Sequence, residues 1–272
     1  MSVARFAALM GALLLTGTAP LAAQDCPSPA QPAGRVAAVD GFGDLVLEDG
    51  RVLRLAGLAV PADALGAGEA AYRAALAKLV GQAPRLAVIG ARPDRFGRLA
   101  VRLAVAGADE AAASLPVTSI NERLLSQGLA VVRPEPGLGA CLPTLLAAEA
   151  PARQARRGLW ADLPVPARDV ARLSAQEGRF TILAGRVLSV GKGRAVDYLN
   201  FGPVWRNDAT VRLTKPARAA LEAAGTSPDG LAGALILARG VVHTAGGPAI
   251  TVEEAGQIAR LDEWDGKRAG TW

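Results

Sequence analysis

The chain has few of the side chains on which many catalytic and metal sites depend. Its 272 residues include one histidine, His243, and two cysteines, Cys26 and Cys141. Mechanisms that need several imidazoles or thiolates are therefore excluded, as are zinc sites of the HExxH type or with four cysteine and histidine ligands. Any catalysis would rest on arginine, aspartate, glutamate, tyrosine or serine, with a hard metal ion held by oxygen atoms.

Aromatic residues and charge of one sign are also scarce. Aromatic side chains make up 4% of the chain, and the formal net charge is only +5. Neither half of the sequence contains a polybasic run, so the charge permits an anionic partner without requiring one. The 51% of hydrophobic residues is typical of a folded globular protein.

The N-terminus has the pattern of a secretory signal over residues 1–23. Arg5 provides the positive charge, an apolar run follows over residues 6–15, and small residues precede a cleavage point at Gln24. The alternative is an uncleaved membrane anchor. No other segment reaches 18 apolar residues, so we expect no membrane span after cleavage and an exported protein, periplasmic or secreted.

Export would permit a disulfide bond between Cys26 and Cys141, since two cysteines allow one pairing. Such a bond would join a loose N-terminal segment to the rest of the protein. The alternative is two unpaired thiols.

The order of predicted elements repeats along the chain. After a Pro-rich lead-in over residues 24–34, the patterns predict three strands, a helix, two strands and two helices, over residues 35–39, 44–47, 51–58, 66–81, 85–89, 99–105, 119–128 and 140–158. Beyond a linker over residues 164–178, three strands, a helix and two strands are predicted again, over residues 180–190, 198–201, 209–213, 216–224, 235–242 and 249–252.

Three strands, a helix and two strands is the order of a five-stranded OB-fold barrel. The predicted fold class is therefore mainly β with helices. We expect an OB-fold barrel with three helices over residues 35–163, a second, smaller OB-like barrel over residues 179–264, and a tail over residues 265–272.

Several short motifs in the first half resemble one known family. They are Val39-Asp40-Gly41, Arg54-Leu55-Ala56-Gly57-Leu58, Asp94-Arg95-Phe96-Gly97-Arg98, Ile120-Asn121-Glu122-Arg123-Leu124-Leu125, Glu149, and Gly158-Leu159-Trp160. In order and spacing, residues 35–160 resemble the thermonuclease (staphylococcal nuclease-like) domain. The resemblance implies an OB barrel with three helices that hydrolyses nucleic-acid phosphodiesters with calcium. The second half resembles, more weakly, the companion domain that follows some exported domains of this kind.

Two arginines stand where the family has catalytic ones. The resemblance places Arg54 and Arg98 on the phosphate, which suits a guanidinium because it binds phosphate oxygens with two hydrogen bonds and stays charged. Arg95 is a further candidate for the phosphate, the alternative being a solvated turn residue. Arg54 and Arg98 have the alternative role of pairing with Asp40 or Asp94 to hold the mouth of the barrel.

The carboxylates of the family motif are replaced. Gly43 and Ala59 stand at the calcium-ligand positions and Ala62 at the position of the general base. Asp40, Asp44 and Asp63 are near, but each is displaced by at least one residue, and in a strand this displacement turns the side chain to the other face. We therefore expect a binding or structural protein that needs no cofactor. The alternative is an active phosphodiesterase with calcium in a rearranged site.

A second group of candidate residues lies in the second half. Tyr198, Phe201 and Trp205 concentrate aromatic rings in a short segment, where they would stack on bases or, alternatively, pack a strand and a turn. The expected partners are a nucleic acid, another anionic polymer or a protein of the cell envelope. The sequence leaves the oligomeric state open.

Overall fold

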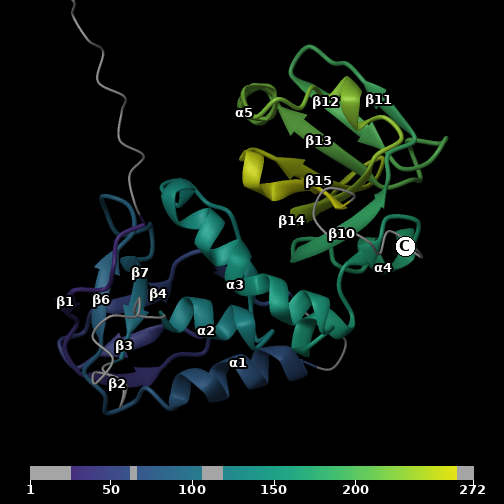
Figure 1. Cartoon of the computed structure of the whole chain (residues 1–272). Coiled ribbons are helices and arrows are strands. Elements are labelled where there is room, and N and C mark those ends of the chain that lie inside the picture. Colours follow the sequence, from purple (N-terminus) through teal and green to yellow (C-terminus); the bar gives the residue numbers. More distant parts are fainter. Residues whose placement is uncertain (1–25, 62–65, 106–118, 262–272) are drawn as a thin grey trace, which may run out of the picture.

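The computed structural model describes residues 26–61, 66–105 and 119–261 (Figure 1). The expected signal segment, the tail, Ala62 and Asp63 lie outside these residues. The described chain is mainly sheet with a few helices, which confirms the predicted fold class.

Six strands form the first sheet, in the order β1-β6-β7-β4-β3-β2. They are β1 (Gln31–Pro32), β2 (Val36–Val39), β3 (Leu45–Leu47), β4 (Val52–Leu55), β6 (Arg85–Val88) and β7 (Arg98–Ala104). The β4 and β7 strands are parallel and the other neighbours antiparallel. Alternate residues such as Leu53 and Leu55 face the core, as expected for a half-buried strand. The short strands β5 (Leu58–Ala59) and β8 (Val131–Val132) pair beside this sheet.

Three helices accompany the sheet, α1 (Ala67–Ala77), α2 (Ile120–Ser126) and α3 (Leu142–Gln154) (Figure 1). A capping box begins helix α2: Ser119 accepts a hydrogen bond from the Glu122 amide, and Glu122 accepts one from the Ser119 amide. Helix α1 ends at Ala77 rather than at residue 81, since the chain turns through Gly81, whose φ is 81°.

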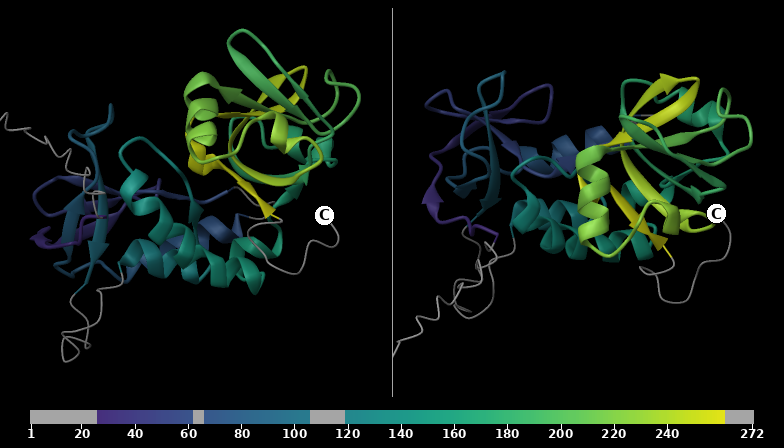
Figure 2. Two further views of the ribbon diagram at one scale, coloured as in Figure 1. Left: turned by 45° about the horizontal axis from the view of Figure 1, so that its top comes forward. Right: turned by 90° about the horizontal axis from the view of Figure 1, so that it is seen from above.

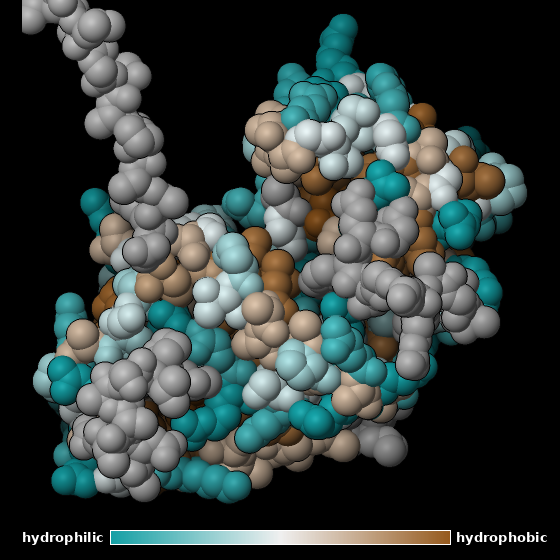
Figure 3. Space-filling view, in the orientation of Figure 1, coloured by the Kyte–Doolittle hydropathy of each residue, from teal (hydrophilic) through white to brown (hydrophobic). Residues whose placement is uncertain are grey.

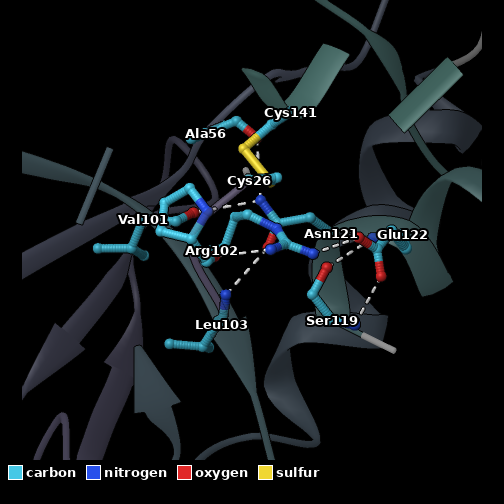
Figure 4. Close-up of a disulfide and its surroundings, with 10 residues drawn as sticks. Cys26, Ala56, Val101, Arg102, Leu103, Ser119, Asn121, Glu122 and Cys141 are labelled. Carbon is cyan, nitrogen blue, oxygen red and sulfur yellow. Dashed lines mark hydrogen bonds and ion pairs between the residues drawn. A yellow bond between two sulfur atoms is a disulfide. The ribbon is translucent and has the colours of Figure 1, made fainter. Parts of the chain in front are cut away.

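The helices are fixed to the sheet by a buried polar cluster next to a disulfide bond (Figure 4). The Asn121 side chain donates to the carbonyls of Ala56 (2.9 Å) and Val101 (3.2 Å) and accepts from the Leu103 amide. Arg102 forms a buried ion pair with Glu122. A disulfide joins Cys26 and Cys141 across 115 residues of chain.

Eight strands form a second sheet, and its main path runs β11-β12-β13-β15-β14-β10-β9, with β16 paired to β14. Its elements are β9 (Val165–Pro166), α4 (Val170–Ser174), β10 (Phe180–Arg186), β11 (Ser189–Gly191), β12 (Val196–Asn200), β13 (Thr210–Thr214), α5 (Lys215–Ala223), β14 (Leu235–Ala245), β15 (Gly247–Val252) and β16 (Ile258–Arg260). Short 3₁₀ turns occupy Gly139–Cys141, Gly158–Ala161, Asp229–Leu231 and Ala255–Gln257.

The second sheet is curled into a half-barrel (Figure 2). Strands β10 and β11 lie near opposite ends of the strand order, where β10 pairs with β14 and β11 pairs with β12. Only Val187 and Leu188 connect them in the chain, so the two ends of the sheet must lie close together. The expectation of a second OB-like barrel stays a prediction, and what is observed is this half-barrel.

Two segments that we expected to be irregular form strands. The predicted linker over residues 164–178 contains β9, which pairs parallel to β10, and helix α4. In the lead-in, β1 pairs with β6. Both segments contain proline, which favoured an irregular structure over a strand. Proline is nevertheless tolerated in a strand at the edge of a sheet, and both strands lie at edges.

The two sheets share a hydrophobic cluster at their junction. Val131, Ala152 and Trp160, which precede the second sheet in sequence, belong to the same hydrophobic cluster as Ile182 and Leu237. Figure 3 shows hydrophobic residues where the two parts meet, with hydrophilic residues over much of the outer surface. No helix in the described residues is both long and apolar enough to cross a bilayer.

One ion pair is buried in this junction. Arg239 of β14 donates to both carboxylate oxygens of Glu149 in α3, at 3.1 and 3.0 Å, and the two side chains are 1% and 0% exposed. Arg239 also donates to the Val132 carbonyl, and Glu149 accepts from the Val132 amide. The pair is therefore fully hydrogen-bonded, the condition under which a buried ion pair is tolerated.

We expect Arg239→Met to lower the free energy of unfolding by about 3–5 kcal/mol, because it leaves the Glu149 carboxylate buried without its charge partner. Urea denaturation checks this. Arg186→Met is the matched control, since Arg186 is exposed and its one hydrogen bond within the described residues is to the Gly233 carbonyl. An equal effect of the two substitutions would contradict the role of the pair.

Replacing both Cys26 and Cys141 by serine should cost about 4–5 kcal/mol of stability, because the bond closes a long loop and limits the unfolded chain. Unfolding of the wild type with and without reductant measures the same quantity. A reductant that destabilises the serine variant as strongly as the wild type would contradict this origin.

Candidate nuclease-like site

The two arginines singled out in the sequence lie on neighbouring strands of the first sheet. Arg54 is in β4 and Arg98 begins β7, and the parallel register places Val52 opposite Arg98 and Arg54 opposite Ala100. Both side chains are partly buried, with 23% and 25% of their surface exposed. They lie at the positions that the sequence predicted for phosphate contacts.

Arg98 is held by two carboxylates. Its Nε donates to Asp94 Oδ2 at 2.8 Å, its Nη2 forms an ion pair with the same oxygen at 2.8 Å, and its Nη1 donates to Asp44 Oδ2 at 2.9 Å. Asp94 also organises the turn before β7, since its Oδ1 accepts from the amides of Phe96 and Arg98. The pairing of Arg98 with Asp94, given above as an alternative role, is present.

The environment moves the two carboxyl pKa values in opposite directions. Burial is the largest effect on Asp44 and raises its pKa, although the nearby Arg98 opposes the shift. Desolvation also acts to raise the pKa of Asp94, but hydrogen bonds from the Arg98 side chain and from backbone amides outweigh it and lower the pKa to about 2. Asp94 is thus the firmly ionised partner of Arg98.

Arg54 has an internal partner that the sequence did not indicate. Its Nη1 donates to Glu135 Oε1 at 3.2 Å, and its Nη2 forms an ion pair with Oε2 at 3.1 Å. Glu135 Oε1 also accepts from the Gly57 amide at 2.9 Å. Glu135 lies between Pro134 and Pro136, three residues after the end of β8. These two prolines are the one feature of the sequence that marks its position.

The position at which the resemblance led us to expect the first calcium ligand has no room for a side chain. Gly43 is buried with φ at 81°, and a Cβ there would lie 2.9 Å from Cε1 of Tyr72. Tyr72 is buried in α1, and this burial raises the pKa of its hydroxyl. The Tyr72 ring therefore fills the space that a carboxylate at position 43 would enter.

The other candidate calcium ligands among the described residues are also unsuited. Ala59, which the resemblance aligns with the second ligand, packs against the hydrophobic cluster of the junction. Asp40 Oδ1 accepts from the amides of Phe42 and Asp44, so it shapes the turn, and Asp44 binds Arg98. The described residues contain no group of three or more His, Cys, Asp or Glu that could hold a metal ion. Since calcium needs six to eight oxygen ligands, the described site does not fit the ion.

The third phosphate candidate, Arg95, is exposed, and its guanidinium lies 4.7 Å from the centre of the Phe96 ring. It contributes to neither ion-pair group. Phe96 and Phe42 are exposed large hydrophobic residues beside the site.

Comparison with protein families agrees with this architecture. Residues 54–162 match the family model described as staphylococcal nuclease homologue. This segment is a staphylococcal nuclease-like domain. Its fold is the OB-fold predicted above. No curated protein matches the chain.

The motifs of the nuclease-like domain fall into two groups. Asn121, Glu122 and Glu149 are buried and make the hydrogen bonds and ion pairs of the core, so their roles are structural. Arg54 and Arg98 lie at the surface of the site. Gly43 and Asp44 precede the matched segment, so the match carries no information on the first ligand position.

We expect Asp94→Asn to flatten the acid dependence of stability. The lowered pKa of Asp94 stabilises the fold above its ordinary value of 3.8, and this contribution is lost as the pH falls toward about 2. Denaturant midpoints of wild type and variant between pH 7 and pH 2 test this. Parallel loss of stability in both proteins across that range would contradict the role of Asp94.

Proposed function

We propose that this is an exported nuclease-fold protein whose first domain has lost calcium-dependent hydrolysis and serves as a structural or binding module. The observation that carries the proposal is that each arginine at the catalytic position is bound by carboxylates of the chain itself. Arg98 is bound by Asp44 and Asp94, and Arg54 is bound by Glu135.

The charge of this arrangement disfavours a phosphodiester. Three carboxylates contact two guanidinium groups, so the contacting groups carry one net negative charge when all are ionised. A phosphate would have to displace Glu135 from Arg54, or Asp44 and Asp94 from Arg98. It would meet the repulsion of the displaced carboxylates at short range.

Hydrolysis would also lack its two other requirements. A general base and a metal ion each supply a large part of the rate of such reactions. Gly43 and Ala59 offer no ligand oxygen in their side chains, and the Tyr72 ring restricts the first of these positions. These observations support a site that stabilises the mouth of the barrel through ion pairs.

Export is supported by the N-terminal sequence pattern and by the disulfide between Cys26 and Cys141. Structural disulfides are typical of oxidising compartments such as the periplasm or the extracellular space.

The proposal predicts that the chain from Gln24 onward does not cleave single-stranded DNA or RNA, with calcium or with EDTA. An active nuclease of this fold serves as the positive control. Calcium-dependent cleavage that Arg54→Gln abolishes, and that the control variant Arg85→Gln leaves intact, would overturn the proposal in favour of a phosphodiesterase with a rearranged metal site.

A further inference from the structure

A cavity of about 440 Å³ lies on the second domain, at the outer face of β12 and β13. Tyr198 and Asn200 of β12 line it, opposite Arg212 and Thr210 of β13 in the antiparallel register. The intervening residues Leu199, Val211 and Leu213 are buried in the hydrophobic core. Since side chains alternate between the faces of a strand, the cavity-lining residues point away from that core.

Two aromatic rings border the cavity. Trp205 is 57% exposed and Tyr198 is 37% exposed, whereas Phe201 packs against the core. Of the three aromatic residues predicted to stack on a ligand, two are therefore available and Phe201 is not. Exposed rings of this kind offer stacking surfaces to planar groups.

The position of Trp205 is fixed by its surroundings. Its ring lies against Gly246, where a Cβ would come within 3.1 Å of ring atoms, so a larger residue at position 246 would displace the indole. The Arg206 guanidinium lies 5.2 Å from the centre of the ring. The loop is held by Asp208, which accepts from the Val204 amide at 2.7 Å. The indole is thus placed beside the cavity before any ligand binds.

Arg212 differs from the arginines of the nuclease-like site because it has no carboxylate partner among the described residues. Its one hydrogen-bond contact in that part of the chain joins Nη1 to His243 Nε2 at 3.4 Å, and its buried Nε has no partner. His243 Nε2 in turn lies 3.4 Å from Thr251 Oγ1. Because no carboxylate of the described residues neutralises this guanidinium, its charge is available to an incoming anion.

The lining of the cavity contains no acidic residue. An anion would therefore meet Arg212 without local repulsion, in contrast to the site around Arg54 and Arg98. A ligand that satisfies both the rings and the guanidinium combines a planar ring with a negative charge. A neutral sugar would stack on Trp205 but would leave the charge of Arg212 uncompensated.

We propose that this cavity binds single-stranded nucleic acid, with a base against Trp205 or Tyr198 and a phosphate on Arg212. Asn200 and Thr210 offer hydrogen bonds to the base or the sugar. A duplex would not present its base faces to the rings, so the proposal is specific for single strands. It is independent of whether the first domain hydrolyses nucleic acid.

Fluorescence anisotropy of a labelled thymidine oligomer, titrated with the chain from Gln24 onward in EDTA, tests this proposal. We expect binding that weakens as salt is raised from 50 to 200 mM. Arg212→Gln and Trp205→Ala should each weaken it at least about fivefold. Arg186→Gln removes the same charge from the same domain outside the cavity and should leave binding near the wild-type level, as should Arg54→Gln.

Circular dichroism and thermal unfolding establish that each variant is folded. Trp205→Phe and Arg212→Lys keep a ring and a charge and should retain most of the binding, so a failure of Trp205→Ala to fold leaves the proposal testable. Absence of binding at 50 mM salt would overturn it. So would loss of binding in Arg54→Gln but not in Arg212→Gln, or equal binding of a neutral oligosaccharide that depends on Trp205.

Discussion

The buried ion pair between Glu149 and Arg239 is the constraint on which both halves of the protein depend. It joins α3 to β14, and both side chains also hydrogen-bond to Val132 at the end of β8. The next three residues of the chain lead to Glu135, which binds Arg54 and the Gly57 amide. One interaction at the centre of the junction therefore fixes the start of the loop that brings a carboxylate to the site. The second sheet is thus part of what determines the state of that site, although it contributes no residue to it.

The contacts that hold the nuclease-like domain together are separate from the ion pairs of Arg54 and Arg98. The residues that hold the nuclease-like domain together, Asn121 and Glu122 among them, bind backbone carbonyls, amides and each other. None of these contacts involves a metal ligand. Gly43 lies against the Tyr72 ring, and Ala59 packs against a hydrophobic cluster. The internal ion pairs neutralise the arginines, whose charges would otherwise be left uncompensated at a partly buried position.

The sequence predicted those features that depend on neighbours in the chain. Most strands of both halves and the helix that begins near Ser119 follow from local periodicity. The partners of Arg54 and Arg239 were not predictable in this way, because Glu135 is 81 residues from Arg54 and Glu149 is 90 residues from Arg239. The sequence Pro134-Glu135-Pro136 matches no motif that would indicate an ion pair with Arg54. The Tyr72 ring was likewise read only as part of a helix, since its contact with Gly43 arises from the packing of α1 on the sheet.

The contrast between the arginines of the two halves follows from what surrounds each guanidinium rather than from its position in a motif. Arg54 and Arg98 match the family and are bound by carboxylates, whereas Arg212 matches no motif and lies beside two exposed rings, without a carboxylate partner in the part of the chain that the structure describes. An external anion binds where its interaction is not already supplied by the protein, because displacing an internal carboxylate offsets the energy gained. The second domain is therefore the part of this chain where an anionic ligand meets the smaller electrostatic cost, even though the family resemblance points to the first.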